Sequence, residues 1–210
     1  MLRPIAIVQA RMGSHRLPGK VLADVAGAPL LARMIERLRA ARTLAGIVVA
    51  TPTGPADAPV RALAASLGVA CFAGSEGDVL ARYAGAAREA GADPVVRLTA
   101  DCPLIDPELV DACVTHFAGG AYDYVSLGGA FPDGLDTEVV AAAALARADA
   151  EARLPSEREL VTPYVWKHPE RFRCGAVPFP AAHGDCRWTV DEPCDLDFVR
   201  AVYARLHRPG

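Results

Sequence analysis

Short apolar segments alternate with longer amphipathic segments along the first half of the chain, and this alternation most strongly constrains its fold. The apolar runs have the length of strands that are buried on both faces. We expect strands at 5–9, 47–51, 69–72 and 94–99. We expect helices at 29–42, 59–67 and 77–90, and another that opens at Asp106-Pro107. This order predicts an α/β fold with a mostly parallel sheet and helices on both faces.

The second half of the chain follows the same alternation less regularly. We expect further strands at 122–126, 135–140, 171–177 and 187–190, helices at 141–152 and 193–206, and a turn-rich crossing at 128–134. No linker-like change in composition divides the chain, so we expect one domain over 1–210. A segment that projects from this domain is expected at about 128–175.

Composition excludes several classes of protein. Of the 210 residues 52% are hydrophobic and the formal net charge is −3, which is unlike a disordered chain or a dedicated nucleic-acid binder. No uncharged apolar run reaches the roughly 18 residues of a membrane span, and the first residues lack a signal-peptide pattern. We therefore expect a cytoplasmic protein with no membrane or nucleic-acid partner. The six cysteines lack zinc-ligand spacing and are expected to be reduced thiols.

A basic, glycine-containing segment follows the first expected strand. Arg11, Arg16 and Lys20 lie within ten residues there, beside Gly13 and Ser14, and the chain has only one other lysine, Lys167. Guanidinium groups, an ammonium group and close backbone approach are what a polyphosphate requires. The pattern is neither a dinucleotide-binding glycine motif nor a Walker P-loop. The alternative interpretation is a solvated surface loop that happens to be basic.

Two aspartates follow expected strands far apart in the chain. Asp101 ends the run Val95–Ala100, and Asp191 ends Arg187–Val190. If both strands are central, the two carboxylates converge near the basic segment, where Mg²⁺ could bind them together with phosphate oxygens. Alternatively, each aspartate only caps the helix that follows it. Cations for phosphates beside carboxylates for a metal suggest transfer of a phosphorus group.

Six motifs carry a resemblance to a known family. They are Gln9–Ser14, Arg16–Lys20, Gly74–Tyr83, Arg97–Ile105, Gly134–Glu138 and Thr189–Pro193. With these motifs the chain resembles the cytidylyltransferases that activate sugar acids. It is most similar to the spore coat polysaccharide biosynthesis protein F branch, which is itself similar to the CMP-KDO and acylneuraminate synthetases.

The resemblance implies a Rossmann-like nucleotidyltransferase fold and transfer of CMP from CTP to a sugar hydroxyl, with release of pyrophosphate. It implies catalytic roles for Arg11, Lys20 and Asp101, and Mg²⁺ held by Asp101 and Asp191. The nucleotide-binding residues that it implies are Ala10, Arg11, Gly13, Ser14, Arg16, Lys20, Gly74, Ser75, Asp78 and Arg82. Asp136 and Glu138 are implied for the acceptor, a small acidic sugar or related molecule, and Glu157 and Arg158 are further candidates. A homodimer formed through the projecting segment is also implied.

The chain departs from the family pattern on the acceptor side. Leu160 stands where the family usually has His, and an isobutyl group has no acid–base or hydrogen-bonding role. Two alternatives therefore remain beside the cytidylyltransferase. One is a nucleotide-binding homologue that has lost acceptor chemistry. The other is a metal-dependent glycosyltransferase, for which the available D-x-D motif is Asp195-Leu196-Asp197.

Overall fold

A mixed sheet forms the centre of the computed structural model, which describes residues 2–128, 131–178 and 183–208. Seven described strands are arranged in the order β5-β4-β1-β6-β8-β7-β9. They are β1 (Ile5–Gln9), β4 (Gly46–Pro52), β5 (Ala70–Gly74), β6 (Val95–Thr99), β7 (Tyr124–Leu127), β8 (Glu138–Val140) and β9 (Cys174–Val177). β8 runs opposite to the other six. The carboxyl ends of six strands therefore lie at one edge, where β8 begins.

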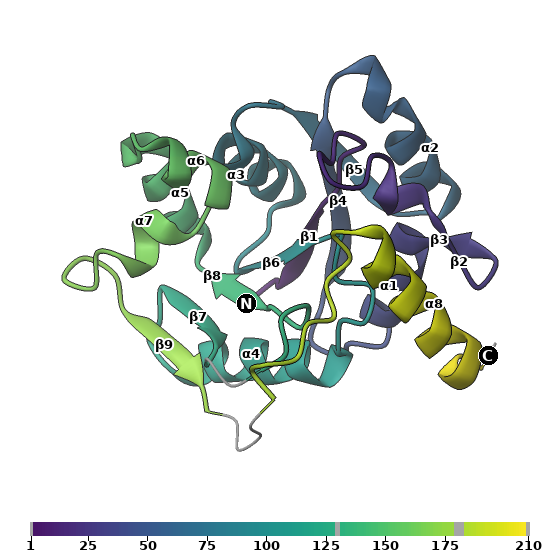
Figure 1. Ribbon diagram of the computed structural model, residues 1–210. Coiled ribbons are helices and arrows are strands. Elements are labelled where there is room, and N and C mark those ends of the chain that lie inside the picture. Colours follow the sequence, from purple (N-terminus) through teal and green to yellow (C-terminus); the bar gives the residue numbers. More distant parts are fainter. Residues whose placement is uncertain (1, 129–130, 179–182, 209–210) are drawn as a thin grey trace.

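Helices cover both faces of this sheet (Figure 1). They are α1 (Leu30–Leu38), α2 (Ala58–Ser66), α3 (Val79–Ala90), α4 (Pro107–Gly119), α5 (Ala142–Glu151), α6 (Pro155–Leu160), α7 (Pro163–Trp166) and α8 (Pro193–Leu206). Alternate side chains of β1 point to opposite faces, because a strand has a period of two. Ile5 and Ile7 pack with α3 and α5, whereas Ala6 and Val8 pack with α1, α2 and α4. The expected α/β architecture is confirmed.

Most of the expected elements are present, with shifted ends. Gly91 ends α3 with a φ of 61°, the left-handed cap that glycine adopts most readily. The sequence did not predict the short hairpin of β2 (Asp24–Val25) and β3 (Ala28–Pro29), which pairs beside α8. Runs of two residues are too short to produce a periodic signal.

The expected strand at 187–190 is wrong. Arg187 forms a single bridge with Asp133, and the chain beyond it is held by separate hydrogen bonds. Gly134 explains why this pairing does not continue, because its φ of 110° turns the segment after Asp133 away from an extended path. A Cβ at Gly134 would lie 2.7 Å from the backbone of Trp188 and Thr189, so these two segments of the chain approach at a distance that only glycine allows.

The segment expected to project contains β8, α5, α6 and α7. Of its expected turn-rich crossing, Gly129 and Ala130 lie outside the described residues. α5 and α6 lie against α3, and α7 lies beside them (Figure 1). Within the described residues, no helix combines the length and the apolar character that crossing a membrane requires.

Candidate active site

A cavity of about 220 Å³ opens at the carboxyl edge of the sheet. It is lined by Gln9, Arg11, Ser14, His15, Arg16, Lys20, Val21, Thr99, Ala100, Asp101 and Asp191. The lining therefore combines the basic segment after β1 with the two aspartates that the sequence singles out. This edge of an open α/β sheet is where ligands usually bind.

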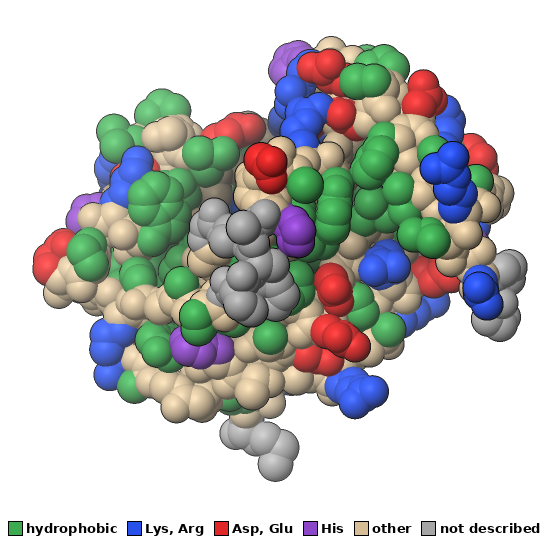
Figure 2. Space-filling view, turned by 60° about the horizontal axis from the view of Figure 1, so that its bottom comes forward, with side chains coloured by type: hydrophobic (Ala, Val, Ile, Leu, Met, Phe, Trp, Pro, Cys, Tyr) green, Lys and Arg blue, Asp and Glu red, His purple; other side chains and the backbone are tan. Residues whose placement is uncertain are grey.

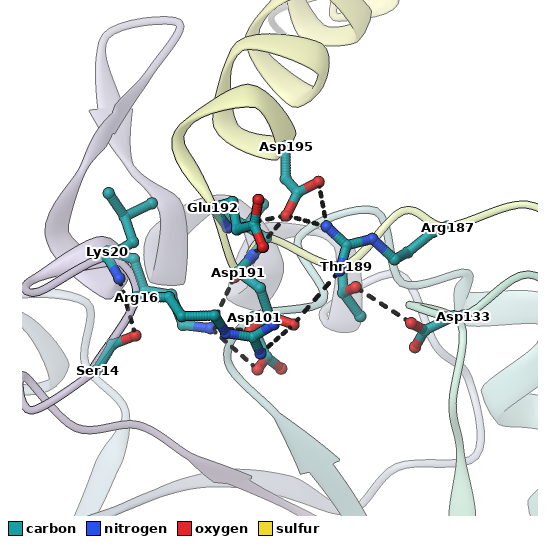
Figure 3. A network of polar contacts seen from close by, with 12 residues as sticks. Ser14, Arg16, Lys20, Asp101, Asp133, Arg187, Thr189, Asp191, Glu192 and Asp195 are labelled. Carbon is teal, nitrogen blue, oxygen red and sulfur yellow. Dashed lines mark hydrogen bonds and ion pairs between the residues drawn. The ribbon is translucent and has the colours of Figure 1, made fainter.

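Lys20 connects the two aspartates. Its Nζ lies 3.2 Å from Oδ2 of Asp101 and 2.9 Å from Oδ1 of Asp191, and it donates to the carbonyl oxygen of Val190 at 2.6 Å. Figure 3 shows these side chains converging with that of Arg16, whose Nη2 lies 2.8 Å from Oδ2 of Asp191. Burial would raise the pKa of Asp101, but the charge and hydrogen bond of Lys20, with further hydrogen bonds, lower it.

The helix caps that would have explained both aspartates structurally are supplied by other residues. Asp106 caps α4 through the N–H of Glu108, at 2.8 Å. At the start of α8, Oδ2 of Asp195 accepts from the N–H groups of Asp191 and Glu192, at 2.9 and 2.8 Å. Asp101 and Asp191 therefore present their carboxylates to the cavity rather than to a helix end.

The carboxylate of Asp195 has a second partner. Arg187 Nη2 lies 2.5 Å from both oxygens of Asp195, and Arg187 Nη1 lies 3.8 Å from Oδ2 of Asp191 (Figure 3). Asp195 thus fixes the backbone of Asp191, and Arg187 fixes Asp195. This support was not predicted from the sequence, because Asp195 looks like a solvated residue of a helix.

A buried aspartate also holds the basic segment. Asp57 is 4% exposed, and its Oδ1 accepts from the N–H of Met12 at 2.7 Å. The N–H of Ala10 donates to the carbonyl oxygen of Ala50 at 3.0 Å. These bonds fix the path of the chain that carries Arg11 and Ser14. No local pattern around Asp57 indicates this role, since its partner lies 45 residues away.

Side chains of the segment that begins with Gly74 form hydrogen bonds mainly within that segment and with α6. Asp78 caps α3 through the N–H of Ala81 at 2.9 Å, and its carboxylate accepts three bonds from Arg158. Burial opposes ionisation of Asp78, but the Arg158 hydrogen bonds hold its pKa below the usual value. Arg82 is fully buried and donates to the carbonyl oxygen of Ser75. Of the expected nucleotide-binding residues, Ala10, Gly13, Gly74, Ser75, Asp78 and Arg82 are not among the described residues that line the cavity.

A second cavity, of about 360 Å³, lies beside β6, β7 and β8. Its lining is Arg97, Tyr124, Ser126, Leu127, Asp136, Thr137, Glu138, Leu160, Thr162, Pro163 and Trp166. Arg97 and Glu138 form an ion pair of 2.7 Å. Tyr124 and Thr162 donate to the other Glu138 oxygen, at 2.5 and 2.7 Å. Burial opposes the charge of Arg97, but Glu138 raises the pKa of Arg97 above its usual value.

Two of the four acceptor-side candidates line this second cavity, namely Asp136 and Glu138. Glu157 is buried and accepts from the backbone N–H groups of Arg153 and Leu154, at 3.2 and 3.1 Å. Arg158 is held by Asp78 and Asp149. Both side chains therefore fix the start of α6 and its contact with α3 rather than a ligand. Arg97 was missed, although a charged residue inside an apolar strand is a signal that could have found it.

The two cavities adjoin along one strand. Thr99 lines the first and Arg97 lines the second. Residues two apart in a strand point to the same face and are about 6.6 Å apart. The two cavities are therefore lined by neighbouring residues on one face of β6.

The site provides only part of a metal shell. Among the described residues, no group of three or more His, Cys, Asp or Glu side chains is arranged to hold a metal ion. Asp101 and Asp191 nevertheless fit Mg²⁺, which commonly takes one or two carboxylates and completes its shell with phosphate oxygens and water. The D-x-D motif offers no second site, because Asp195 caps α8 and Asp197 is an exposed residue that pairs with Arg200.

Charged side chains of both signs are interspersed over the face of the molecule shown in Figure 2. Among the described residues on that face, no wide area carries a single sign of charge. This distribution differs from the basic stripe that is typical of a nucleic-acid-binding surface.

Comparison with known proteins identifies the family. The family model for cytidylyltransferases matches residues 5–205. The spore coat polysaccharide biosynthesis protein SpsF of Bacillus subtilis is 33% identical over 207 residues, which cover 95% of this chain and 85% of that protein. A cytidylyltransferase structure from Leptospira borgpetersenii superposes with a TM-score of 0.94 at 32% identity, covering 99% of this chain and 89% of that one.

A more distant structure shows the same fold. CMP:2-keto-3-deoxy-manno-octonic acid synthetase, solved in complex with CTP, has a TM-score of 0.78 at 19% identity and covers 97% of this chain and 99% of that one. Together with the family match over almost the whole chain, these likenesses confirm the family that the sequence motifs indicated. The chain belongs to the cytidylyltransferase family, the nucleotidyltransferases that use CTP.

Proposed function

We propose that this protein transfers CMP from CTP to a hydroxyl group of a small acidic sugar, or of a related acidic acceptor, with release of pyrophosphate. The observation that supports this most is the convergence of Lys20, Asp101 and Asp191 in a cavity that the basic segment also lines. A second cavity adjoins it and offers a place for the acceptor. The acceptor hydroxyl would attack the α-phosphorus, and the bond to the pyrophosphate oxygen would break.

The basic side chains of the first cavity would bind the triphosphate. Arg11, Arg16 and Lys20 line this cavity, and their charges would stabilise the negative charge that develops on the departing pyrophosphate. Ser14 lies in the same lining and offers a hydroxyl donor. Asp57 is a positioning residue here, because it fixes the backbone at Met12 without reaching the cavity. Phosphoryl transfer depends mainly on such positioning and charge stabilisation.

Mg²⁺ would be held by Asp101 and Asp191. When bound, it neutralises phosphate charge and orients the reacting group. The two aspartates are 90 residues apart in the sequence, and the fold brings both carboxylates to the ammonium group of Lys20. Asp195 and Arg187 support the position of Asp191.

The acceptor would bind in the second cavity. Asp136 and Glu138 lie in its lining, and Leu127, Leu160, Pro163 and Trp166 give it an apolar wall. Glu157 and Arg158 are not part of this proposed acceptor site, since their charged atoms are bound within the fold. Leu160 in this wall supports an acceptor that presents an apolar part next to its hydroxyl groups.

The wider setting belongs to the same proposal. The relative from Bacillus subtilis is named for polysaccharide synthesis, which suggests that this protein supplies an activated precursor for a surface polysaccharide. Leu154, Leu160 and Trp166 are 55%, 53% and 44% exposed around α6 and α7, which supports a homodimer formed through this segment. A nucleoside triphosphate as donor fits a cytoplasmic location.

A pyrophosphate-release screen tests the function directly. Each of the four ribonucleoside triphosphates is combined with a panel of acidic sugars, with Mg²⁺ and again with excess EDTA. We expect release only from CTP, only with a suitable acceptor and only without EDTA. Binding of CTP with no turnover against the whole panel would instead support a homologue without acceptor chemistry. Transfer of an intact sugar from a nucleotide-sugar would support a glycosyltransferase.

A further inference from the structure

Both oxygens of the Asp191 carboxylate are already in ion pairs. Oδ1 lies 2.9 Å from Nζ of Lys20, and Oδ2 lies 2.8 Å from Nη2 of Arg16. Asp101 shares the same ammonium group through Oδ2, at 3.2 Å. A divalent ion that needs an Asp191 oxygen therefore has to displace one of these two cations.

The charges of this cluster also balance. Two carboxylates face the ammonium group of Lys20 and the guanidinium group of Arg16, and Arg187, 3.8 Å from Oδ2 of Asp191, is itself paired with Asp195. The cluster therefore carries no net charge to attract a free metal ion. The Lys20 side chain is 10% exposed, which favours strong ion pairs because water screens them little. The Arg16 side chain is 57% exposed and can leave its partner more easily.

We propose that Lys20 occupies the cation position between Asp101 and Asp191 in the nucleotide-free protein, so that the metal binds only together with the nucleotide. The proposal rests on the proposed function, because the exchange needs a polyphosphate. Lys20 and Arg16 line the cavity in which the triphosphate would bind. When they turn to the phosphates, the carboxylates are released for the metal, and every charge keeps a partner.

The geometry favours exchange over a simple clamp. In a clamp, Lys20 would hold the carboxylates in place and leave free oxygens for the metal. Asp191 has no oxygen without a cation beside it, because Arg16 and, at 3.8 Å, Arg187 lie next to the second one. The carbonyl oxygen of Val190 accepts a further hydrogen bond from the Lys20 ammonium group, at 2.6 Å, and helps to hold it between the two carboxylates.

The test measures metal binding without nucleotide, so it does not depend on turnover. Mn²⁺ is titrated into the nucleotide-free protein and free Mn²⁺ is followed by electron paramagnetic resonance. We expect weak or no binding to the wild type. Lys20→Met should bind Mn²⁺ at least about tenfold more tightly, while its affinity for CTP falls, since a coupling of this size is typical between linked sites. Lys167→Met removes the other lysine, which lies over the ring of Trp166, and should behave as the wild type.

Arg16→Gln provides a second variant. Because the Arg16 side chain is exposed, this substitution should not prevent folding. It should raise Mn²⁺ affinity by a smaller factor than Lys20→Met. Weaker Mn²⁺ binding in Lys20→Met would establish a clamp and overturn the exchange. Unchanged affinity in both variants, or tight Mn²⁺ binding to the wild type, would also overturn it. In each of these cases pyrophosphate release from CTP by the wild type would still support the proposed function.

Discussion

The two cavities both contain ion pairs, but these pairs differ in what surrounds them. In the first cavity, Lys20 and Arg16 face carboxylates that are 29% and 20% exposed, and the cations can exchange partners when a ligand enters. In the second, the Arg97–Glu138 pair is fixed by Tyr124 and Thr162, which occupy the remaining carboxylate oxygen. Lys20 and Arg16 of the first cavity can therefore pair with a ligand, whereas Arg97 and Glu138 of the second cavity stabilise the fold.

This difference indicates how each ligand is recognised. A polyphosphate can replace carboxylate partners for cations, so an internally paired cluster still binds it. Under the proposed function, an acceptor in the second cavity would meet Glu138, whose two oxygens already accept bonds, together with the side chain of Asp136 and an apolar wall. We therefore expect its selection to depend more on shape and on a few hydrogen bonds than on net charge.

Asp101→Asn should have the largest effect on the first cavity. The change removes one of two carboxylate charges that hold Lys20 and one of the two carboxylates proposed to hold the metal, and we expect pyrophosphate release to fall at least about 100-fold. The fold should persist, as circular dichroism would show. Asp106→Asn is the matched control, because asparagine also caps α4 and turnover should be retained. Retained turnover in Asp101→Asn would remove Asp101 from the site.

Glu138→Gln should act on the framework of the second cavity. The neutral amide leaves the Arg97 guanidinium without its counter-charge, which typically costs about 3 kcal/mol in a buried pair. Urea denaturation should show this loss, while calorimetry should show unchanged CTP affinity. Glu36→Gln breaks an exposed pair with Arg33 and should cost less than about 1 kcal/mol. Equal losses in the two variants would contradict the view that the Arg97–Glu138 pair is structural.

Asp195→Asn tests whether Asp195, which does not line the first cavity, positions Asp191. Asparagine can still accept from a backbone N–H, but it loses the charge that binds Arg187, and Asp191 becomes less well fixed. We expect turnover and Mn²⁺-dependent CTP binding to fall about tenfold, the lower end of what outer-shell changes cost. Asp197→Asn changes the other aspartate of the same motif, which is 75% exposed in its side chain, and should have no effect. A similar loss in both variants would refute the positioning role of Asp195.

The sequence predicted the first cavity better than the second for a physical reason. Lys20 and Asp101 follow strands whose apolar pattern is local and clear, and parallel strands bring their carboxyl ends to one edge. Asp191 was placed correctly although its strand was wrong, because a hydrogen bond from Val190 to the carbonyl oxygen of Asp101 ties the two segments together. That bond depends on a contact between residues 89 positions apart and has no local signal.

Several supporting residues outside the two cavities depend on contacts that local patterns encode only in part. Glu157 sits three residues after Leu154, where a glutamate often binds the N–H groups at a helix start, so its role as a cap was open to prediction. Arg158 could not be assigned in this way, because Asp78 and Asp149 reach it only in the folded chain. Asp57 is a similar case, since a single aspartate in a turn carries no sign of its partner.

Leu160→Ala should produce the smallest effect and separates the two cavities most cleanly. Leu160 is 53% exposed, so its truncation should change stability by less than about 0.5 kcal/mol. Because it lines only the second cavity, the KM for CTP should stay constant while the KM for the acceptor rises a few-fold, in proportion to the lost apolar contact. Leu2→Ala is the control, since Leu2 is 48% exposed and lies outside the lining of both cavities. If Leu160→Ala changed the KM for CTP instead, the two cavities would not be separate binding sites.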